Sequence, residues 1–487
     1  MKRIYLILIV LIGISLSCTE NYEDFNTDKK KPVEVPGNAL FANAQKALAD
    51  QIATPNVNLN IWKMMAQYWT ATTYLDEPNY DIFTRAVPDA QFQVYYRNVL
   101  SDFSAAKSVI SDEEAVGVEA TAAKQNRLHI ITLMECFTYH ELVDIFGNIP
   151  YTEACNIDII NPVYDDAATI YSDLINRVTA ATEGLDDAYG SFGSEDLYMS
   201  GDVAMWKKFG RTLLIKIGIN LADVNSSLAQ STIAAGLDGD GPFTFGETCQ
   251  INYPGGSNSN QLYLEVVASG RNDFVPCATM VDIMNALNDP RRDNYFTLYD
   301  NATPDPSDDL FKGGPYGAPN NFTQFSGFAE PILQPDFPMV LLDYTEVAFY
   351  LAEAAARGYS VGGDAETWFN NGVKSSILHW DGTEDDYNTY IAQANVAYDA
   401  ANWEESIGTQ AWLAYYIRGF QGWTSWRRLD VPALIMPPNP DDNANGQIIK
   451  RFTYPVNEQT LNKINYEAAS EAIGGDFIWK RVFWDLD

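Results

Sequence analysis

The sequence predicts a mainly α-helical protein in which helices pack in pairs, akin to tetratricopeptide units, between long irregular loops. Apolar residues recur at helical spacing in several long runs, and no pattern of strands alternating with helices is visible. Two stretches rich in Gly, Pro, Asn and Ser, 238–276 and 299–338, interrupt the helical runs. Loops of this length inside a compact domain are either disordered or functional.

Each predicted helix begins or ends at a recognisable signal. Gly147 stops the first helix and Pro150 follows it, whereas an Asp stands at the start of each of the next four. Gly358 follows the fourth helix as its C-cap. The predicted helices span residues 120–146, 165 or 166 to 185, 202–221, 343–357, 364–380 and 409–429.

The composition excludes several classes of function. Acidic residues outnumber basic ones by 65 to 31, so the net charge is −34 and nucleic acid is repelled. Only three histidines occur, which removes most metal sites built from several histidines. Aromatic residues make up 13% of the chain, enough to fill a core and still form a surface on which a ligand stacks.

The N-terminus predicts export from the cytoplasm. Two basic residues precede the apolar run Ile4–Ile14, whose eleven residues fall short of the roughly 18 needed to cross a bilayer. Cys18 stands where a bacterial lipoprotein signal places its lipidated cysteine, a resemblance that implies a lipid anchor there. We therefore expect a lipoprotein signal peptide over 1–17, a flexible tether over 18–36 and a single helical domain over 37–487.

Four cysteines follow the proposed lipidation site, and none lies in a CxxC pair that would indicate a metal cluster or thioredoxin chemistry. An exported protein can pair its cysteines, although a core of this size needs no disulfide. The sequence leaves the pairing of Cys136, Cys155, Cys249 and Cys277 open.

Two motifs that suggest catalysis lack the context that catalysis needs. Residues 358–362 match the G-x-S-x-G elbow of serine hydrolases, but a strong helix precedes them where that elbow requires a strand. His140 and Glu141 begin like a zinc-protease motif, but the second histidine is replaced by Asp144. We expect His129, His140 and His379 to be structural, and we expect no catalytic residue and no cofactor.

A third motif, Asp441–Gly446, matches the first half of an EF-hand calcium loop. Position twelve of that loop would be Phe452 instead of the bidentate Glu that completes the site. We therefore predict a polar surface turn and no resident metal, with adventitious calcium left open.

Seven segments resemble, in order along the chain, the SusD/RagB family and specifically its SusD-like second group. The segments are Tyr68–Pro78, Asp144–Ala154, Asp289–Arg292, Tyr344–Gly358, Gly422–Arg428, Arg451–Pro455 and Arg481–Asp485. The resemblance implies a cell-surface lipoprotein of the outer membrane, with a tetratricopeptide-like scaffold and no enzymatic activity. Such a protein captures oligosaccharides and delivers them to a SusC-type TonB-dependent outer-membrane transporter.

Two other functions remain as alternatives. The same scaffold carries oligopeptides in some relatives, so oligopeptide capture is the second hypothesis. A glycoside hydrolase hidden in the acidic surface is the third, although the 65 carboxylates prevent any catalytic pair from being chosen by spacing.

The resemblance also places ligand contacts on the loops of one face, from an N-terminal segment and a mid-chain insertion. A sugar ring has an apolar C–H face that an aromatic ring covers, and a rim of hydroxyls that amides pair with. Trp69 and Tyr74 lie in a segment that packing alone would also explain. Matching by position gives Trp69, Tyr74, Tyr80, Tyr316, Phe322 and Phe325 as aromatic platforms, with Asn320, Asn321 and Gln324 as rim donors.

Overall fold

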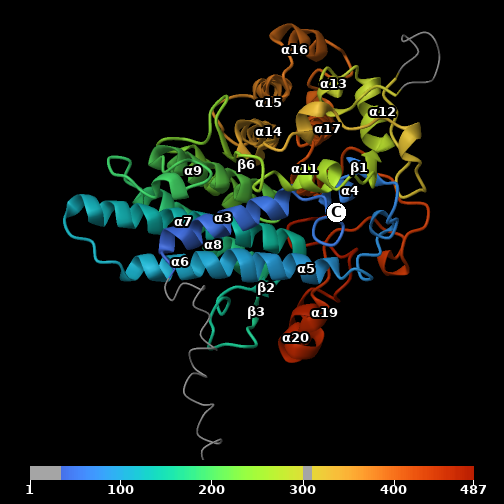
Figure 1. The fold of residues 1–487 in the computed structure, drawn as a ribbon. Coiled ribbons are helices and arrows are strands. Elements are labelled where there is room, and N and C mark those ends of the chain that lie inside the picture. The colour runs from blue at the N-terminus through green and yellow to red at the C-terminus, as the bar shows by residue number, and fades with distance from the viewer. Residues whose placement is uncertain (1–34, 300–309, 487) are drawn as a thin grey trace, which may run out of the picture. The chain divides into compact units, whose positions relative to one another are not determined.

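The computed structural model describes residues 35–299 and 310–486, and helices make up most of what it describes (Figure 1). The mainly α-helical fold class predicted from the sequence is confirmed. The predicted signal peptide, Cys18 and nearly all of the predicted tether lie outside the described residues. From Gly37 onward the chain forms one compact unit.

The helices are joined by connections of very different lengths in both halves of the chain. The α-helices are α3 (Gly37–Ala53), α4 (Trp62–Met65), α5 (Val87–Gln93), α6 (Ser101–Asp112), α7 (Val118–Phe146), α8 (Ala167–Gly184), α9 (Val203–Asn220), α10 (Ser226–Leu237), α11 (Gln261–Tyr263), α12 (Ala278–Ala286), α13 (Arg292–Tyr295), α14 (Tyr344–Ala356), α15 (Ala365–His379), α16 (Glu384–Ile391), α17 (Trp403–Ala414), α18 (Gly419–Leu429), α19 (Val456–Leu461) and α20 (Lys463–Ala472). Two π-helical segments, η2 (Val94–Leu100) and η4 (Leu264–Ala268), continue α5 and α11.

Packing links the helices in the order of the chain. α3 packs on α6, α6 on α7, α7 on α8, α8 on α9 and α9 on α10, so the first half is a row of neighbouring helices (Figure 1). α9 also packs on α14, which joins this row to the pairs α14–α15 and α17–α18. The helical pairing predicted from the sequence therefore forms the body of the described chain.

Five of the six predicted helices are confirmed, as α7, α8, α9, α14 and α15. In the last four, the side chain of the Asp at the N-cap accepts a hydrogen bond from the backbone N–H three residues on. The predicted helix over 409–429 is wrong: it is divided into α17 and α18, with Ile417 at a left-handed φ of 74°. The break lets Gly419 approach α4 closely, since a Cβ there would lie 2.4 Å from the backbone N of Lys63.

Within residues 35–299 and 310–486, three short antiparallel strand pairs lie between the helices. They are β1 (Trp69–Ala71) with β5 (Phe274–Pro276), β2 (Ile149–Pro150) with β3 (Tyr164–Asp165), and β4 (Thr248–Ile251) with β6 (Met339–Asp343). The stretch 238–276 is therefore not a continuous loop, because it contains β4, α11, η4 and β5. Its buried residues alternate over only four positions in β4, too few to predict a strand.

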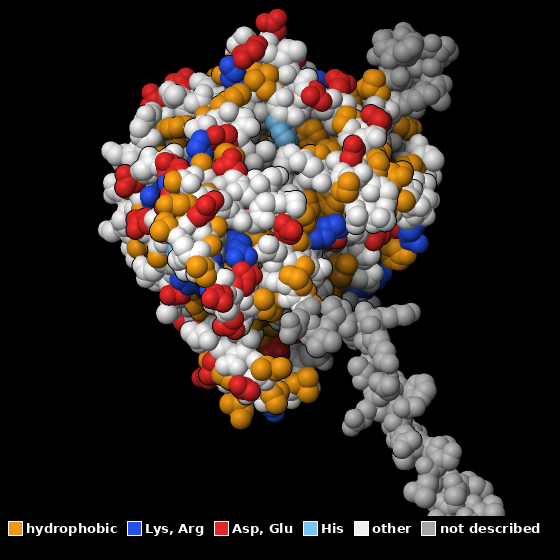
Figure 2. All heavy atoms as spheres, turned by 60° about the vertical axis from the view of Figure 1, so that its left-hand side comes forward, with side chains coloured by type: hydrophobic (Ala, Val, Ile, Leu, Met, Phe, Trp, Pro, Cys, Tyr) orange, Lys and Arg blue, Asp and Glu red, His pale blue; other side chains and the backbone are white. Residues whose placement is uncertain are grey.

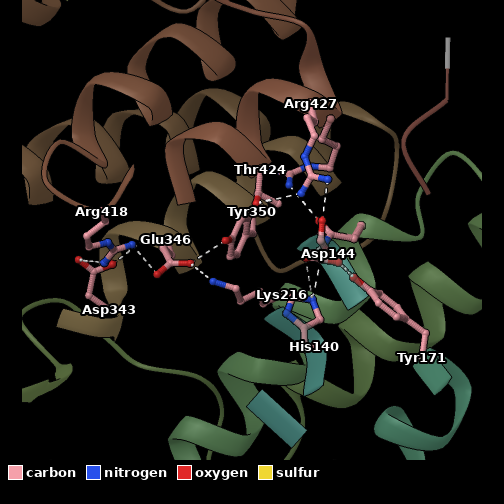
Figure 3. Close-up of polar contacts among 12 residues, drawn as sticks. His140, Asp144, Tyr171, Lys216, Asp343, Glu346, Tyr350, Arg418, Thr424 and Arg427 are labelled. Atoms are coloured by element: carbon pink, nitrogen blue, oxygen red, sulfur yellow. Dashed lines mark hydrogen bonds and ion pairs between the residues drawn. The ribbon is translucent and has the colours of Figure 1, made fainter. Parts of the chain in front are cut away.

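A chain of buried charges crosses the interior between α9, α14 and α18 (Figure 3). The Glu346 carboxylate, which is fully buried, accepts hydrogen bonds from Lys216 Nζ at 3.0 Å and from Tyr350 at 2.6 Å. Arg418 also donates to Glu346, and its second terminal nitrogen lies 3.2 Å from Asp343. Each buried charge thus has an opposite partner, which is the condition for keeping it out of water.

A second buried cluster surrounds Asp144 of α7 (Figure 3). Tyr171 donates to its carboxylate, and the Trp484 indole N–H does so at 2.7 Å. Arg427 donates to the Asp144 backbone carbonyl at 2.7 Å, and its guanidinium lies 4.7 Å from the Trp484 ring centroid. Burial lowers the pKa of His140 to about 4, so the neutral imidazole beside Asp144 is structural, as predicted.

The four cysteines and most of the helical tryptophans have structural positions. Cys136, Cys249 and Cys277 are buried free thiols and Cys155 is an exposed one, so none is paired. Trp206, Trp423 and Trp426 are buried, whereas Trp368 is half-buried.

Exposed aliphatic side chains gather at one tip of the molecule, formed by the β2–β3 loop and by α19–α20 (Figure 2). Ile157 is 95% exposed and Ile464 is 82% exposed. The Asn465 amide holds the two segments together, since it donates to the carbonyls of Asn161 and Pro162 at 3.0 and 3.1 Å. Among residues 35–299 and 310–486, no helix is both long and apolar enough to span a bilayer.

Candidate functional site

The predicted ligand-binding segments do meet in space, on a surface that we call the irregular face and define as residues 72–86, 270–273, 310–328 and 435–445. Its base is the β1–β5 pair, which joins the N-terminal segment to residues two hundred positions later. The long loop 310–328 lies against β1. The Gly314 backbone N–H donates to the carbonyl of Pro276 at the end of β5, and the Gly314 carbonyl accepts from the N–H of Ala278 at the start of α12.

Asn320 fastens the long loop to β1. Its side-chain amide donates to the carbonyls of Ala71 and Ala318 at 2.9 Å and of Pro315 at 3.1 Å. Because Asn320 is only 8% exposed and its N–H groups are used internally, it does not fit the predicted role of rim donor. We assign it the role of holding the loop.

Three predicted aromatic platforms lie inside the protein. Trp69 is 1% exposed, and its ring stacks on Phe328 at a centroid distance of 4.1 Å. Tyr80 and Tyr316 are 1% and 2% exposed and lie near each other, with ring centroids 6.5 Å apart. These three rings are buried and offer no free face to a ligand, so the structure does not support their predicted role as platforms.

Five predicted residues do reach the surface of the irregular face. Tyr74, Asn321 and Gln324 are exposed, and Phe322 and Phe325 are half-buried. Phe322 and Gln324 belong to a single turn of 3₁₀-helix whose N-cap is Asn321. Aromatic rings and amide groups are thus adjacent there, as contact with a sugar requires.

Tyr74 is the exposed ring with the most distinctive surroundings. It has a left-handed φ of 54°, and its hydroxyl accepts a hydrogen bond from Arg271. The guanidinium carbons of Arg85 and Arg271 lie 4.8 and 5.2 Å from its ring centroid. The two guanidiniums hold the ring in place while leaving 38% of the residue exposed.

The irregular face also contains basic residues that were not among the site residues predicted from the sequence. Arg271 pairs with Asp273, while Lys312 lies 4.6 Å from the Tyr299 ring centroid and 5.3 Å from that of Phe325. Lys312 forms no ion pair with any described carboxylate. No periodicity or motif marks these cations, because only the fold brings them to the aromatic rings.

A buried carboxyl lies behind Tyr74. The Glu77 side chain is fully buried, and Arg85 Nε lies 3.0 Å from its carboxylate. Burial raises the pKa of Glu77 to about 7, and the Arg85 charge opposes that rise. Its ionisation therefore changes near neutral pH beside the exposed ring.

The C-terminal segment closes the edge of the irregular face. The Asn79 amide donates to the Gly317 carbonyl at 2.7 Å, and Asn79 also accepts from the backbone N–H of Asn439. The EF-hand-like turn follows, where the Asp441 carboxylate accepts from Asn443. Within the described ranges, no group of three His, Cys, Asp or Glu residues could hold a metal ion.

The irregular face carries groups that can bind a ligand, namely exposed rings, amides and guanidiniums. None of the three histidines lies in its segments, so it lacks the imidazole that most acid–base catalysis uses. The G-x-S-x-G match follows helix α14, and Gly358 has a φ of 87°, as expected of a helix C-cap. That serine therefore does not stand on a nucleophile elbow.

Comparison with known proteins identifies the family. A family model described as "SusD-like_2: Starch-binding associating with outer membrane" matches residues 29–455. A chitin-binding protein of known structure has a TM-score of 0.82 at 22% identity, with 93% of this chain and 100% of that chain covered. A SusD homologue from Bacteroides uniformis has a TM-score of 0.79 at 21% identity, covering 92% and 99%.

A chitin-binding SusD homologue from Flavobacterium johnsoniae is also similar, with a TM-score of 0.76, 20% identity and coverage of 92% and 98%. No protein with a curated description matches the sequence. The structural likeness confirms the predicted tetratricopeptide-like helical scaffold. Because the family model matches most of the chain, the protein belongs to the SusD-like family of starch-binding, outer-membrane-associated proteins.

Proposed function

We propose that the protein captures neutral oligosaccharides on its irregular face and delivers them to a SusC-type TonB-dependent outer-membrane transporter. The observation that carries the proposal is that three rings, of exposed Tyr74 and half-buried Phe322 and Phe325, reach the surface of the irregular face together with the exposed amides of Asn321 and Gln324. The family description names starch binding, and two similar structures are described as chitin-binding.

The strength of such a site follows from the area of its rings. A ring that covers about 50 Å² of a sugar contributes roughly 1.3 kcal/mol. Three such rings give about 4 kcal/mol, near millimolar affinity, before hydrogen bonds and the costs of binding. Phe322 and Phe325 are half-buried and contribute less than a fully exposed ring. Weak binding suits a protein that must release its cargo.

Charge selects among the possible ligands. The net charge of −34 disfavours sulfated and uronic sugars over the whole surface. On the irregular face, Arg85 and Arg271 are each neutralised by a neighbouring Asp, and Lys312 is a single cation without a described carboxylate partner, too little to reverse the preference set by the whole surface. Neutral glycans are therefore the favoured class.

Delivery to a transporter depends on the N-terminal segment. A lipid at Cys18 would hold the protein at the outer membrane, and residues 18–36 would act as its tether. The absence of enzymatic activity belongs to the same proposal, since capture and transfer leave the oligosaccharide intact. A TonB-dependent transporter would then be the partner.

Isothermal calorimetry with chitin- and starch-derived oligosaccharides, compared with mixed oligopeptides, tests the proposed ligand. We expect a neutral glycan to bind, Tyr74→Ala to lower its affinity roughly tenfold, and Tyr189→Ala, which removes a half-buried tyrosine elsewhere, to leave it unchanged. Binding of peptides alone would replace the proposal with oligopeptide capture. Shorter sugars appearing after long incubation would instead indicate a glycoside hydrolase.

A further inference from the structure

A second polar groove lies outside the irregular face, between α3, α11 and the two π-helical segments η2 and η4. It has a volume of about 400 Å³, within the roughly 300–1,000 Å³ usual for small-ligand sites. We call it the amide groove and define it by Asn43, Asp50, Gln51, Asn98, Gln261 and Glu265. None of these residues belongs to the irregular face.

Internal hydrogen bonds fix the polar side chains of the amide groove. Asn43 donates to Asp102 at 2.6 Å, and Gln51 donates to the Leu59 carbonyl at 2.8 Å. Asn56 donates to one oxygen of Glu265 at 2.9 Å. Asn43, Gln51 and Glu265 each keep one side-chain oxygen for a ligand. Because these side chains are already held in place, little side-chain entropy is lost on binding.

Other amides of the groove have their full capacity available. Within the described residues, the side chains of Asn98 and Gln261 form no hydrogen bond. Ala47, Leu59 and Val94 add apolar surface between the polar groups. Amides around an aliphatic patch match the two sides of a sugar ring, its hydroxyl rim and its C–H face.

The two π-helical segments supply a second, independent indication of function. The backbone N–H of Ser269 bonds to the carbonyl of Leu264, five residues earlier, and Ser101 bonds to Tyr96 in the same way. Such turns are rare and often occur at functional sites. η2 contributes Asn98 and η4 contributes Glu265, although the segments are far apart in sequence and the groove lies between them.

We infer that the amide groove is a second carbohydrate-binding site, which takes a neutral sugar unit of a polysaccharide whose other units reach the irregular face of the same or another molecule. The inference rests on the proposed function for its ligand class. The groove has two carboxylates, Asp50 and Glu265, against the single ammonium of Lys46, so an anionic sugar is repelled. Two weak sites on one polymer raise the apparent affinity without any new contact.

Affinity electrophoresis in gels containing soluble starch or glycol chitin tests the groove. We expect Asn98→Ala combined with Gln261→Ala to weaken retardation by the polysaccharide roughly tenfold, because two hydrogen bonds are lost. The matched control is Gln125→Ala, an exposed amide on α7, which should behave as the wild type. Asn98→Trp fills the groove from an exposed position and should have the same effect as the double variant.

Combining Asn98→Trp with Tyr74→Ala separates the contribution of the amide groove to binding from that of the irregular face. We expect Tyr74→Ala alone to leave residual binding, and Tyr74→Ala with Asn98→Trp to weaken that residual binding by roughly a further tenfold. Unchanged retardation by Asn98→Trp in both backgrounds would overturn the amide groove and leave the irregular face standing. Failure of the wild-type protein to bind any neutral polysaccharide would overturn the proposed function and the groove together.

Discussion

We predict that Asn320→Ala destabilises the long loop of the irregular face, because the Asn320 side chain holds this loop in place. Asn320→Ala removes an amide that donates to three carbonyls, at 2.9 Å for Ala71, 2.9 Å for Ala318 and 3.1 Å for Pro315. The amide has two N–H groups, so two effective hydrogen bonds are lost, each contributing about 0.5–1.5 kcal/mol. The loop should lose about 2 kcal/mol of local stability.

Hydrogen exchange read by mass spectrometry measures that loss directly. A reduction of about 2 kcal/mol makes the amides of 310–328 exchange roughly 30-fold faster where exchange depends on local opening. Gln324→Ala is the matched control, because this exposed amide in the same loop has no side-chain hydrogen bond within the described residues. Equal exchange in the two variants would refute the assignment of Asn320 as the fastening residue.

Three further outcomes are expected. Tyr74→Phe should keep glycan affinity within about twofold, measured by calorimetry, because it retains the ring and loses only the bond from a guanidinium. Glu346→Ala should lower the free energy of unfolding in urea by about 3–5 kcal/mol, because it leaves Lys216 and Arg418 buried without that partner. Burial raises the pKa of Glu141 from 4.5 to about 7, so its proton stabilises the fold fully below pH 4.5 and that stability is lost as the pH rises through 7. Glu141→Gln should therefore gain on the wild type by up to about 3 kcal/mol between pH 5 and 8.

Each of these outcomes has a result that contradicts it. A tenfold loss in Tyr74→Phe would show that the hydroxyl, and not the ring, binds the ligand. A Glu346→Ala variant as stable as the wild type would mean that water reaches the two cations. A stability difference between Glu141→Gln and the wild type that stays constant with pH would place the pKa of Glu141 near its ordinary value.

Helices were predictable where a local signal agreed with the packing. Asp202 and Asp364 start α9 and α15, as expected, because a short acidic side chain caps the free N–H groups of a helix start. The break between α17 and α18 was not predictable, because it depends on Gly419 meeting the backbone of α4 far away in sequence. A tertiary contact there overrides a continuous helical pattern.

The site was predictable in its segments but only partly in its residues. Position along the chain placed Trp69 and Tyr74 together, yet Trp69 is covered by Phe328 while Tyr74 remains exposed. The letter for an aromatic residue in a loop is the same whether its ring packs into the core or faces solvent. Composition therefore cannot separate a core ring from a ligand platform. Likewise, Arg271 and Lys312 stand in no motif and acquire their positions only when the chain folds.

The bond from Trp484 to Asp144 spans 340 residues, and this has a consequence for biosynthesis. A nascent chain that has left the ribosome only as far as α18 contains Asp144 and Arg427 but not the indole that covers them. The cluster around Asp144 is therefore complete only after almost all of the chain has been made. Truncations before Trp484 lack a hydrogen bond to the buried Asp144 carboxylate, so they should be degraded instead of accumulating as shorter domains.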